Sequence, residues 1–168
     1  MKGRFTGSTS AGKDIARTCG ELLKPVTLEL GGKSAAVVLE DADLDAFLPF
    51  VGGLCIPNSG QICFSTTRIL APMTRYRGVV DAVADTLNGL TVGYPRSPDT
   101  VVGPPLSGRQ RERVEGYIQL GRDGGAKIAA GGRRHGHRIR TQDSSSSRLY
   151  FMTLTTPCML HARRSPAW

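Results

Sequence analysis

The chain has 168 residues and a formal charge of +8, from 22 Lys and Arg against 14 Asp and Glu. Its length alone indicates one domain. An apolar content of 39% is too high for a disordered chain and too low for a membrane protein, and every apolar run is shorter than the ~18 residues of a membrane helix. The first ten residues lack the apolar core of a signal peptide, so we expect a cytoplasmic protein.

The positive charge is unevenly distributed. Residues 135–168 hold five Arg and a single Asp, so half of the excess charge lies in one fifth of the chain. Basic residues interleaved with stacking aromatics, which nucleic-acid binding needs, are absent from the sequence. The four Cys are scattered without paired spacing, which argues against a disulfide framework and against a metal site.

Helical and strand patterns alternate along the first 134 residues. Three N-cap residues, Ser8 to Ser10, open a predicted helix over 8–23, which Pro25 ends. The next predicted elements are strands over 26–30 and 35–39 and a helix from Asp43 to Val51. There follow a loop over 57–66, a strand over 68–71, a helix over 76–87, a long connection over 88–108, a helix over 109–120 and a strand over 126–130.

This order predicts an α/β fold with a mainly parallel sheet. Residues 135–168 show no period and contain a run of four serines, so we expect that segment to be disordered.

The first candidate site is the segment Gly7–Lys13, at the start of the first helix. Free N–H groups at a helix start attract phosphate, and glycine lets a ligand approach the backbone. The spacing matches most of a nucleotide-binding P-loop, but Asp14 stands where Ser or Thr would bind Mg²⁺. Only six residues precede Gly7, so no strand is expected there. A glycine-containing helix cap stays the simpler interpretation.

Two further candidates are a carboxylate and a thiol. Glu29 lies in an apolar strand, where burial would suit a general base, although strand alternation can equally turn it to water. Cys63 lies in a glycine-containing loop, where an exposed thiolate would be a strong nucleophile and a packed thiol would be inert. Because no His precedes His135, such a nucleophile would need a carboxylate as its base. Cys19 and Cys55 fall on apolar helical faces.

Three motifs in register resemble the aldehyde dehydrogenase superfamily. They are FTGSTSAG at 5–12, VTLELGGKS at 26–34 and NSGQIC at 58–63. The segment EDADLD at 40–45 and the stretch 91–132 match the family's downstream order, so the resemblance covers about residues 5–134. It implies an α/β fold with an incomplete three-layer, parallel-sheet catalytic domain. Residues 1–31 would belong to the cofactor-binding domain and 32–134 to part of the catalytic domain.

The resemblance also implies a mechanism. Cys63 would attack an aldehyde to form a thiohemiacetal, NAD or NADP would accept hydride, and water activated by Glu29 would hydrolyse the resulting thioester. The backbone N–H of Cys63 would serve the oxyanion hole, and Asn58 and Gln61 would shape the nucleophile's loop. The residues implied to line the cofactor are Gly7, Ser8, Gly12, Leu30 and Gly31.

Several family features have no counterpart in this sequence. The Asn that completes the oxyanion hole, the Lys that holds the cofactor ribose and the E-x-F-G-P segment are absent, and Tyr94 stands where the family usually has Asp. We therefore expect a middle piece of a longer enzyme, lacking the segments with which the family forms homo-oligomers.

The tail has two possible origins. Residues 135–168 do not follow the family pattern, but a neighbouring reading frame of suitable codons can spell the family's continuation, which suggests a frameshift between about Gly132 and His135. The alternative is an unrelated extension.

Two other functions stay open beside aldehyde oxidation with NAD or NADP. The chain could be a catalytically inactive fragment of such an enzyme, because positioning groups act together. It could also be a nucleotide-binding module that uses Gly7–Lys13.

Overall fold

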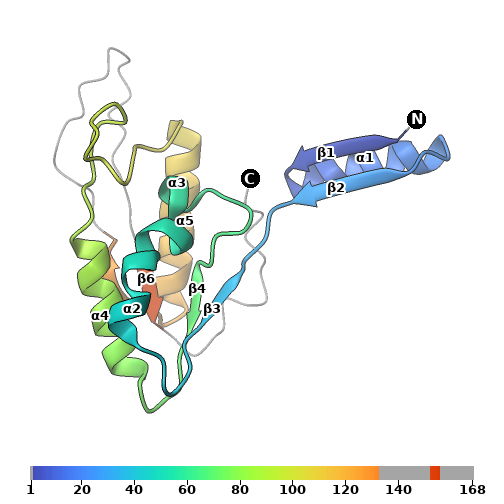
Figure 1. Cartoon of the computed structure of the whole chain (residues 1–168). Helices are drawn as coiled ribbons and strands as arrows, with labels where there is room; N and C mark the ends of the chain where they lie inside the picture. The colour runs from blue at the N-terminus through green and yellow to red at the C-terminus, as the bar shows by residue number, and fades with distance from the viewer. Residues whose placement is uncertain (1, 133–151, 156–168) are drawn as a thin grey trace.

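The computed structural model describes residues 2–132 and 152–155. They form an arm and a body (Figure 1). The arm contains β1 (Gly3–Gly7), α1 (Thr9–Glu21) and β2 (Val26–Leu30). The two strands are parallel, with Gly3 opposite Val26 and Gly7 opposite Leu30, and α1 packs on both. A strand, a helix and a parallel strand in succession make a βαβ unit.

The body continues from the arm through residues 31–34. Its elements are β3 (Ala35–Val37), α2 (Leu44–Phe47), the π-helix η1 (Val51–Cys55), α3 (Pro57–Gly60), β4 (Arg68–Leu70), α4 (Tyr76–Asn88), α5 (Gly108–Asp123), β5 (Lys127–Gly131) and β6 (Met152–Thr155). Strands β3 and β4 are parallel, with Ala35 opposite Arg68, whereas β5 and β6 are antiparallel. The described residues thus form an α/β fold of short, mostly parallel strands, which is the predicted class. These strands pair in three two-stranded sheets and not in one.

The core of the body lies between β3, η1, α4 and β5. Its buried residues come from these elements and their immediate ends: Val38, Val51, Cys55, Val79, Val83, Ala84, Leu87 and Ala130. The valines of α4 recur at helical spacing, so one face of that helix is buried, and the helix packs against both η1 and β5.

Several elements differ from the sequence prediction. A strand, β1, precedes the first helix, where none was expected. Strand β3 ends at Val37 instead of residue 39, and the helix expected to reach Val51 is only α2, followed by η1. Gly52 and Gly53, which have low helix propensity, lie in this π-helix.

The predicted loop over 57–66 begins with a single turn, α3, that contains left-handed residues. The connection between α4 and α5 has neither helix nor strand, as expected, but Val92 and Val102 form an isolated bridge across it. Within the segment predicted to be disordered, residues 152–155 form β6. The rest of that prediction, and the proposed frameshift position after Gly132, lie outside the described residues.

Candidate active site at the junction of arm and body

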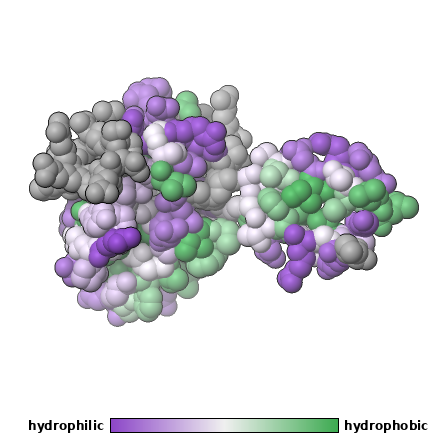
Figure 2. Space-filling model, turned by 90° about the horizontal axis from the view of Figure 1, so that it is seen from above, coloured by the Kyte–Doolittle hydropathy of each residue, from purple (hydrophilic) through white to green (hydrophobic). Residues whose placement is uncertain are grey.

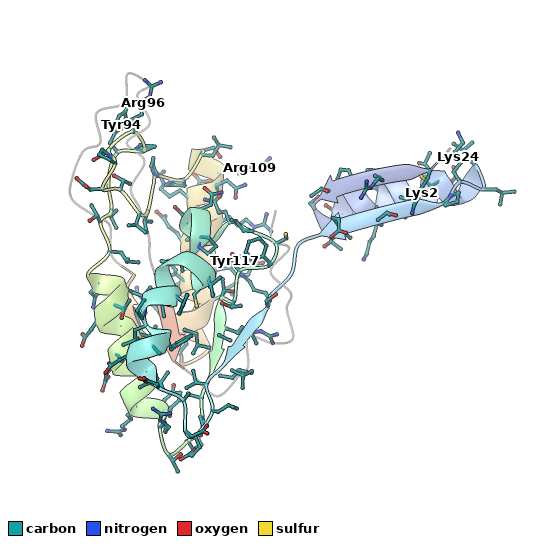
Figure 3. All side chains as sticks on the ribbon, in the orientation of Figure 1. Lys2, Lys24, Tyr94, Arg96, Arg109 and Tyr117 are labelled. Atoms are coloured by element: carbon teal, nitrogen blue, oxygen red, sulfur yellow. The ribbon has the colours of Figure 1, made fainter. Side chains whose placement is uncertain are left out.

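The arm presents the start of α1 and the ends of its two strands toward the body. Both strands run toward the body, so Gly7 and Leu30, which are paired, lie at that end (Figure 1). Lys2 and Lys24 lie at the opposite end (Figure 3). In βαβ units, ligands bind at the carboxyl ends of parallel strands beside the helix start. The arm therefore directs its expected ligand-binding end at the junction.

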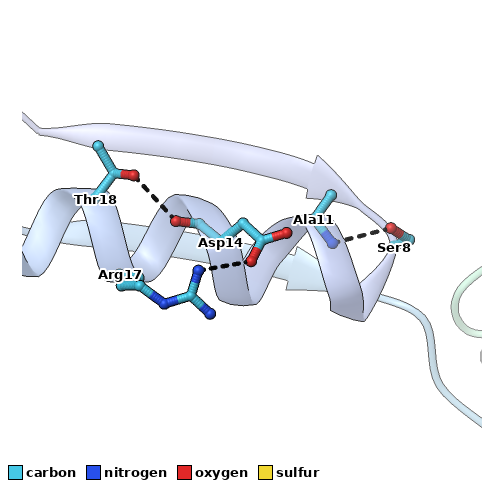
Figure 4. A network of polar contacts seen from close by, with 5 residues as sticks. All are labelled: Ser8, Ala11, Asp14, Arg17 and Thr18. Carbon is cyan, nitrogen blue, oxygen red and sulfur yellow. Dashed lines mark hydrogen bonds and ion pairs between the residues drawn. The ribbon is translucent and has the colours of Figure 1, made fainter.

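The start of α1 is capped by Ser8. Its hydroxyl accepts a hydrogen bond from the Ala11 N–H at 3.3 Å (Figure 4). The same hydroxyl lies 3.1 Å from the Ser10 hydroxyl. The first N–H groups of a helix have no partner within the helix, and the helix dipole favours an anion there. This donor set suits the phosphates of a dinucleotide cofactor.

Gly12 and Leu30, two residues that the resemblance assigns to the cofactor, contact each other. A Cβ on Gly12 would lie 2.7 Å from Cδ2 of Leu30, so the Leu30 side chain would have to shift if a larger residue stood here in α1. Gly12 is buried in this contact. The glycine thus has a packing role, whether or not a cofactor lies nearby.

The arm bears in two ways on the P-loop alternative. Strand β1 does precede the Gly7–Lys13 segment, so the expectation that no strand precedes it is wrong. Asp14 lies where that motif would place a magnesium-binding hydroxyl, and its carboxylate forms an ion pair with Arg17 at 2.9 Å (Figure 4). The carboxylate is thus paired on the helix surface, and the motif still lacks the hydroxyl.

The segment after β2 reaches the loop of Cys63. A Cβ on Gly32 would lie 3.0 Å from the backbone oxygen of Cys63, so these two backbones are in close contact. Ser34 lies two residues after Gly32, just before β3. Its carbonyl accepts a hydrogen bond at 3.4 Å from the N–H of Arg68, the first residue of β4. Partial burial lowers the pKa of Lys33, between these two contacts, although its side chain keeps access to solvent.

The two candidate reactive side chains are both exposed. Cys63 lies in the loop after α3 and keeps a free, exposed thiol. Glu29 lies opposite Thr6 in the β1–β2 pair and faces solvent, so the burial considered for it from the sequence is not found. Glu29 precedes Gly32 by three residues, so the Cα atoms of these two residues are at most about 11 Å apart.

Asn58 and Gln61 contact each other in the turn before Cys63. The side-chain amide of Gln61 donates to the Asn58 carbonyl at 3.3 Å, and the Gln61 N–H lies 3.2 Å from the same oxygen. The Gln61 side chain therefore binds the backbone of this turn, to which Asn58 contributes its carbonyl oxygen.

Gly32 is a site residue that the sequence reasoning did not select. From the sequence, the pair Gly31–Gly32 indicates the end of a strand and, at Gly31, a cofactor contact. Two consecutive glycines after a strand are also a signal for close approach of another backbone, which is what the structure shows at Gly32.

The described residues offer no metal site and no membrane helix. Within residues 2–132 and 152–155, no group of three or more His, Cys, Asp or Glu is arranged to hold a metal ion. No helix in those ranges has the length and apolar character needed to cross a bilayer.

Comparisons with known proteins agree on one family. The sequence model of the aldehyde dehydrogenase family matches residues 2–152. A geranial dehydrogenase of Castellaniella defragrans is 55% identical over 130 residues, which are 77% of this chain and 27% of the relative. A vanillin dehydrogenase of an Amycolatopsis species is 41% identical over 128 residues, 76% of this chain and 26% of that protein.

The solved structures give the same result. An aldehyde dehydrogenase from Bacillus cereus, in complex with NAD⁺, superposes with a TM-score of 0.83 at 36% identity, over 99% of this chain and 33% of that one. The chain spans about a quarter of the length of the curated relatives that it matches. By sequence and by fold, this chain belongs to the aldehyde dehydrogenase family.

Proposed function

We propose that this chain carries the nucleophile of an NAD(P)-dependent aldehyde dehydrogenase, which oxidises an aldehyde to a carboxylic acid. The observation that carries the proposal is the contact between Gly32 and the backbone of Cys63. It joins the end of β2, which bears Glu29, to the loop that bears the thiol, and these are the two groups that the chemistry requires.

Cys63 is the proposed nucleophile. Its thiolate attacks the aldehyde carbonyl carbon and forms a thiohemiacetal, while its own N–H donates to the developing oxyanion. NAD(P)⁺ held at the start of α1 would supply the acceptor for the hydride that the thiohemiacetal carbon loses, which leaves a thioester on Cys63. Glu29 then takes a proton from the water that hydrolyses the thioester and releases the acid. Asn58 and Gln61 hold the turn that presents the thiol.

The arm is the proposed cofactor-binding part. The amides at the start of α1, beside Gly7 and Ser8, would bind the pyrophosphate, because they supply unpaired donors and the positive end of the helix dipole. Gly12 keeps α1 close to β2, and Leu30 and Gly31 would lie toward the nicotinamide. Domain boundaries at 31 and 134 and a cytoplasmic location stay predictions. So does the expectation that this chain lacks the segments with which the family forms homo-oligomers.

The test measures NADH and NADPH formation by the full chain with geranial and with vanillin. We expect Cys63→Ser to abolish turnover, since a serine hydroxyl is a much weaker nucleophile than a thiolate. Glu29→Gln should lower steady-state turnover, because it removes the proposed base for thioester hydrolysis. Cys19→Ser is the matched control and should keep the parent rate.

Three other outcomes of these assays would point to a different nucleophile, to an inactive fragment or to a nucleotide-binding module. Turnover that survives Cys63→Ser overturns the assignment of the nucleophile. Alkylation of Cys63 by iodoacetamide without any turnover indicates the inactive fragment. Binding of ATP that is lost in Lys13→Gln would support the nucleotide-binding module instead.

A further inference from the structure

The turn before Cys63 has an unusual backbone. Asn58 (φ 49°, ψ 45°) and Ser59 (φ 60°, ψ 31°) are left-handed, and Gly60 follows with φ 79°. Glycine adopts this region freely, but two consecutive residues with side chains rarely do so. Such a conformation persists only where surrounding contacts hold it.

Ser59 makes such a contact with the connection between α4 and α5. Its hydroxyl accepts a hydrogen bond from the Gly103 N–H at 3.1 Å and lies 3.5 Å from the Gly103 carbonyl oxygen, to which it donates. A hydroxyl can donate and accept at once. The Ser59 side chain is half-buried, so this pair is partly shielded from water.

The position of Gly103 is fixed because its neighbour Val102 is buried and is hydrogen-bonded through both its N–H and its carbonyl. Val102 is only 1% exposed, and its N–H donates to the Thr91 carbonyl at 3.1 Å. The Val102 carbonyl in turn accepts from the Gly93 N–H at 3.1 Å. The long connection is therefore fixed at the point where Ser59 binds it.

The far end of the Cys63 loop is also held. The Ser65 N–H donates to the Ile62 carbonyl at 3.1 Å, and the Thr66 N–H donates to the Leu54 carbonyl in η1 at 3.0 Å. Cys63 thus lies between two attachments, one to η1 and one to Gly103. Each attachment includes a side chain: the Ser59 hydroxyl binds Gly103, and the Thr66 hydroxyl lies 3.3 Å from the Cys55 sulfur in η1.

We propose that Ser59 is a positioning residue for Cys63: its hydrogen bonds to Gly103 keep the left-handed turn that sets the direction of the thiol. This deepens the proposed function and rests on it for its catalytic meaning. The position of the thiol can nevertheless be measured without cofactor or aldehyde.

The first experiment compares three variants of the full chain by the rate of Cys63 alkylation with iodoacetamide, followed by mass spectrometry over a range of pH. Ser59→Ala and Ser59→Gly remove the hydroxyl, and Ser59→Thr keeps it. We expect alkylation about threefold faster or more in the first two variants, because the loop is released at one end. Ser59→Thr should stay near the parent rate and pH profile.

The proposal would be overturned if the alkylation rates of the variants followed how well each residue tolerates the left-handed backbone. Glycine relieves the left-handed conformation and threonine suits it least, so a parent-like Ser59→Gly with an altered Ser59→Thr would show that the hydroxyl is irrelevant. Equal rates in all variants would overturn it as well. The matched control is Ser107→Ala, which removes the N-cap bond to Gln110 in α5 and should leave Cys63 alkylation unchanged.

The second experiment needs no variant and covers the case in which a variant fails to fold. In the parent chain, hydrogen exchange should show the Gly103 amide protected to a similar degree as the Gly93 amide. A Gly103 amide that exchanges as in an unstructured peptide contradicts the proposal. Since neither experiment uses NAD(P)⁺ or an aldehyde, absence of dehydrogenase activity would leave this inference standing.

Discussion

Gly32 shows how one missing side chain sets the distance between two segments. A Cβ at this position would lie 3.0 Å from a backbone oxygen, and a backbone cannot move aside as a flexible side chain can. The contact therefore demands glycine at this position if the Cys63 loop is to stay where it is.

Gly32→Ala should displace the loop of Cys63 by a few tenths of an ångström or more. We expect a changed rate of Cys63 alkylation, of about twofold or more, with the fold retained. Gly78→Ala is the matched control, because a Cβ there meets nothing within 4 Å. Equal alkylation rates in the parent and in both variants would contradict this role of Gly32.

Lys33 gives the junction a dependence on pH. Desolvation lowers its pKa below the ordinary 10.5. Between the lowered value and 10.5 the unfolded chain binds more protons than the folded one, so the free energy of unfolding rises with pH in that window. Lys33→Gln does not titrate. Urea unfolding of both chains over alkaline pH should show the parent gaining stability relative to the variant as pH rises, and parallel curves would refute this.

At the scale of elements, α1 carries two glycines with opposite expected effects. In Gly12→Ala the new Cβ would displace the Leu30 side chain of β2 from its present rotamer, at a net cost of about 1 kcal/mol. In Gly20→Ala the Cβ meets nothing within 4 Å, and the helix should gain about 0.5–1 kcal/mol. Chemical unfolding followed by circular dichroism measures both changes. Effects of the same sign would contradict the α1–β2 packing.

Arg75 connects two loops at the amino end of α4. Its Nη1 lies within 3.0 Å of three backbone carbonyl oxygens, those of Leu39, Glu40 and Ala42. Arg75→Gln should lower the free energy of unfolding by roughly 2 kcal/mol, because these acceptors lose a charged donor. The exposed Arg77 is the control, and Arg77→Gln should change stability by less than about 0.5 kcal/mol in the same urea titration.

The elements that the sequence predicted well are those with a strong local pattern. Strand β2 occupies the predicted residues, and α1, α4 and α5 differ from their predictions by a few residues at most at each end. Strand β1 was missed because Gly3–Gly7 has no apolar alternation of its own and is a strand only through its pairing with β2. The end of the Asp43–Val51 helix was misplaced because a π-helix has no separate sequence pattern.

The candidate site shows the same limit. Motif order was sufficient to select Cys63, Glu29, Asn58 and Gln61, but not to find that Gly32 contacts the thiol's loop. That contact joins residues from two segments far apart in the chain. The asparagine and the glycine before Gln61 tolerate left-handed backbone. Ser59 between them is left-handed as well, and its partner lies 44 residues away.

At the scale of the whole molecule, the ends of β3 and β4 present an apolar pair of side chains to solvent on one open face. Val37 is 65% and Leu70 48% exposed, and the two are paired in register. Val38, beside Val37, faces the core. Parallel strands are normally covered on both faces. Hydrophobic surface is also visible on both arm and body in Figure 2.

This open face should make the chain self-associate. Replacing Val37 and Leu70 together by Thr, which keeps strand propensity, should reduce concentration-dependent light scattering. Leu106, 92% exposed in the α4–α5 connection, provides the control, and Leu106→Thr should have a smaller effect. Equal effects would show that exposure in general, and not this face, drives association.

The number of residues between paired segments also predicts the order in which these pairs form during folding. Short loops close at a smaller entropic cost than long ones, so the contiguous arm should assemble before β3 finds β4. The Ser59–Gly103 bridge, which spans 44 residues, should close late. A nascent or heat-stressed chain would therefore hold a finished arm while the thiol at position 63 still moved freely, exposed to any oxidant in its surroundings.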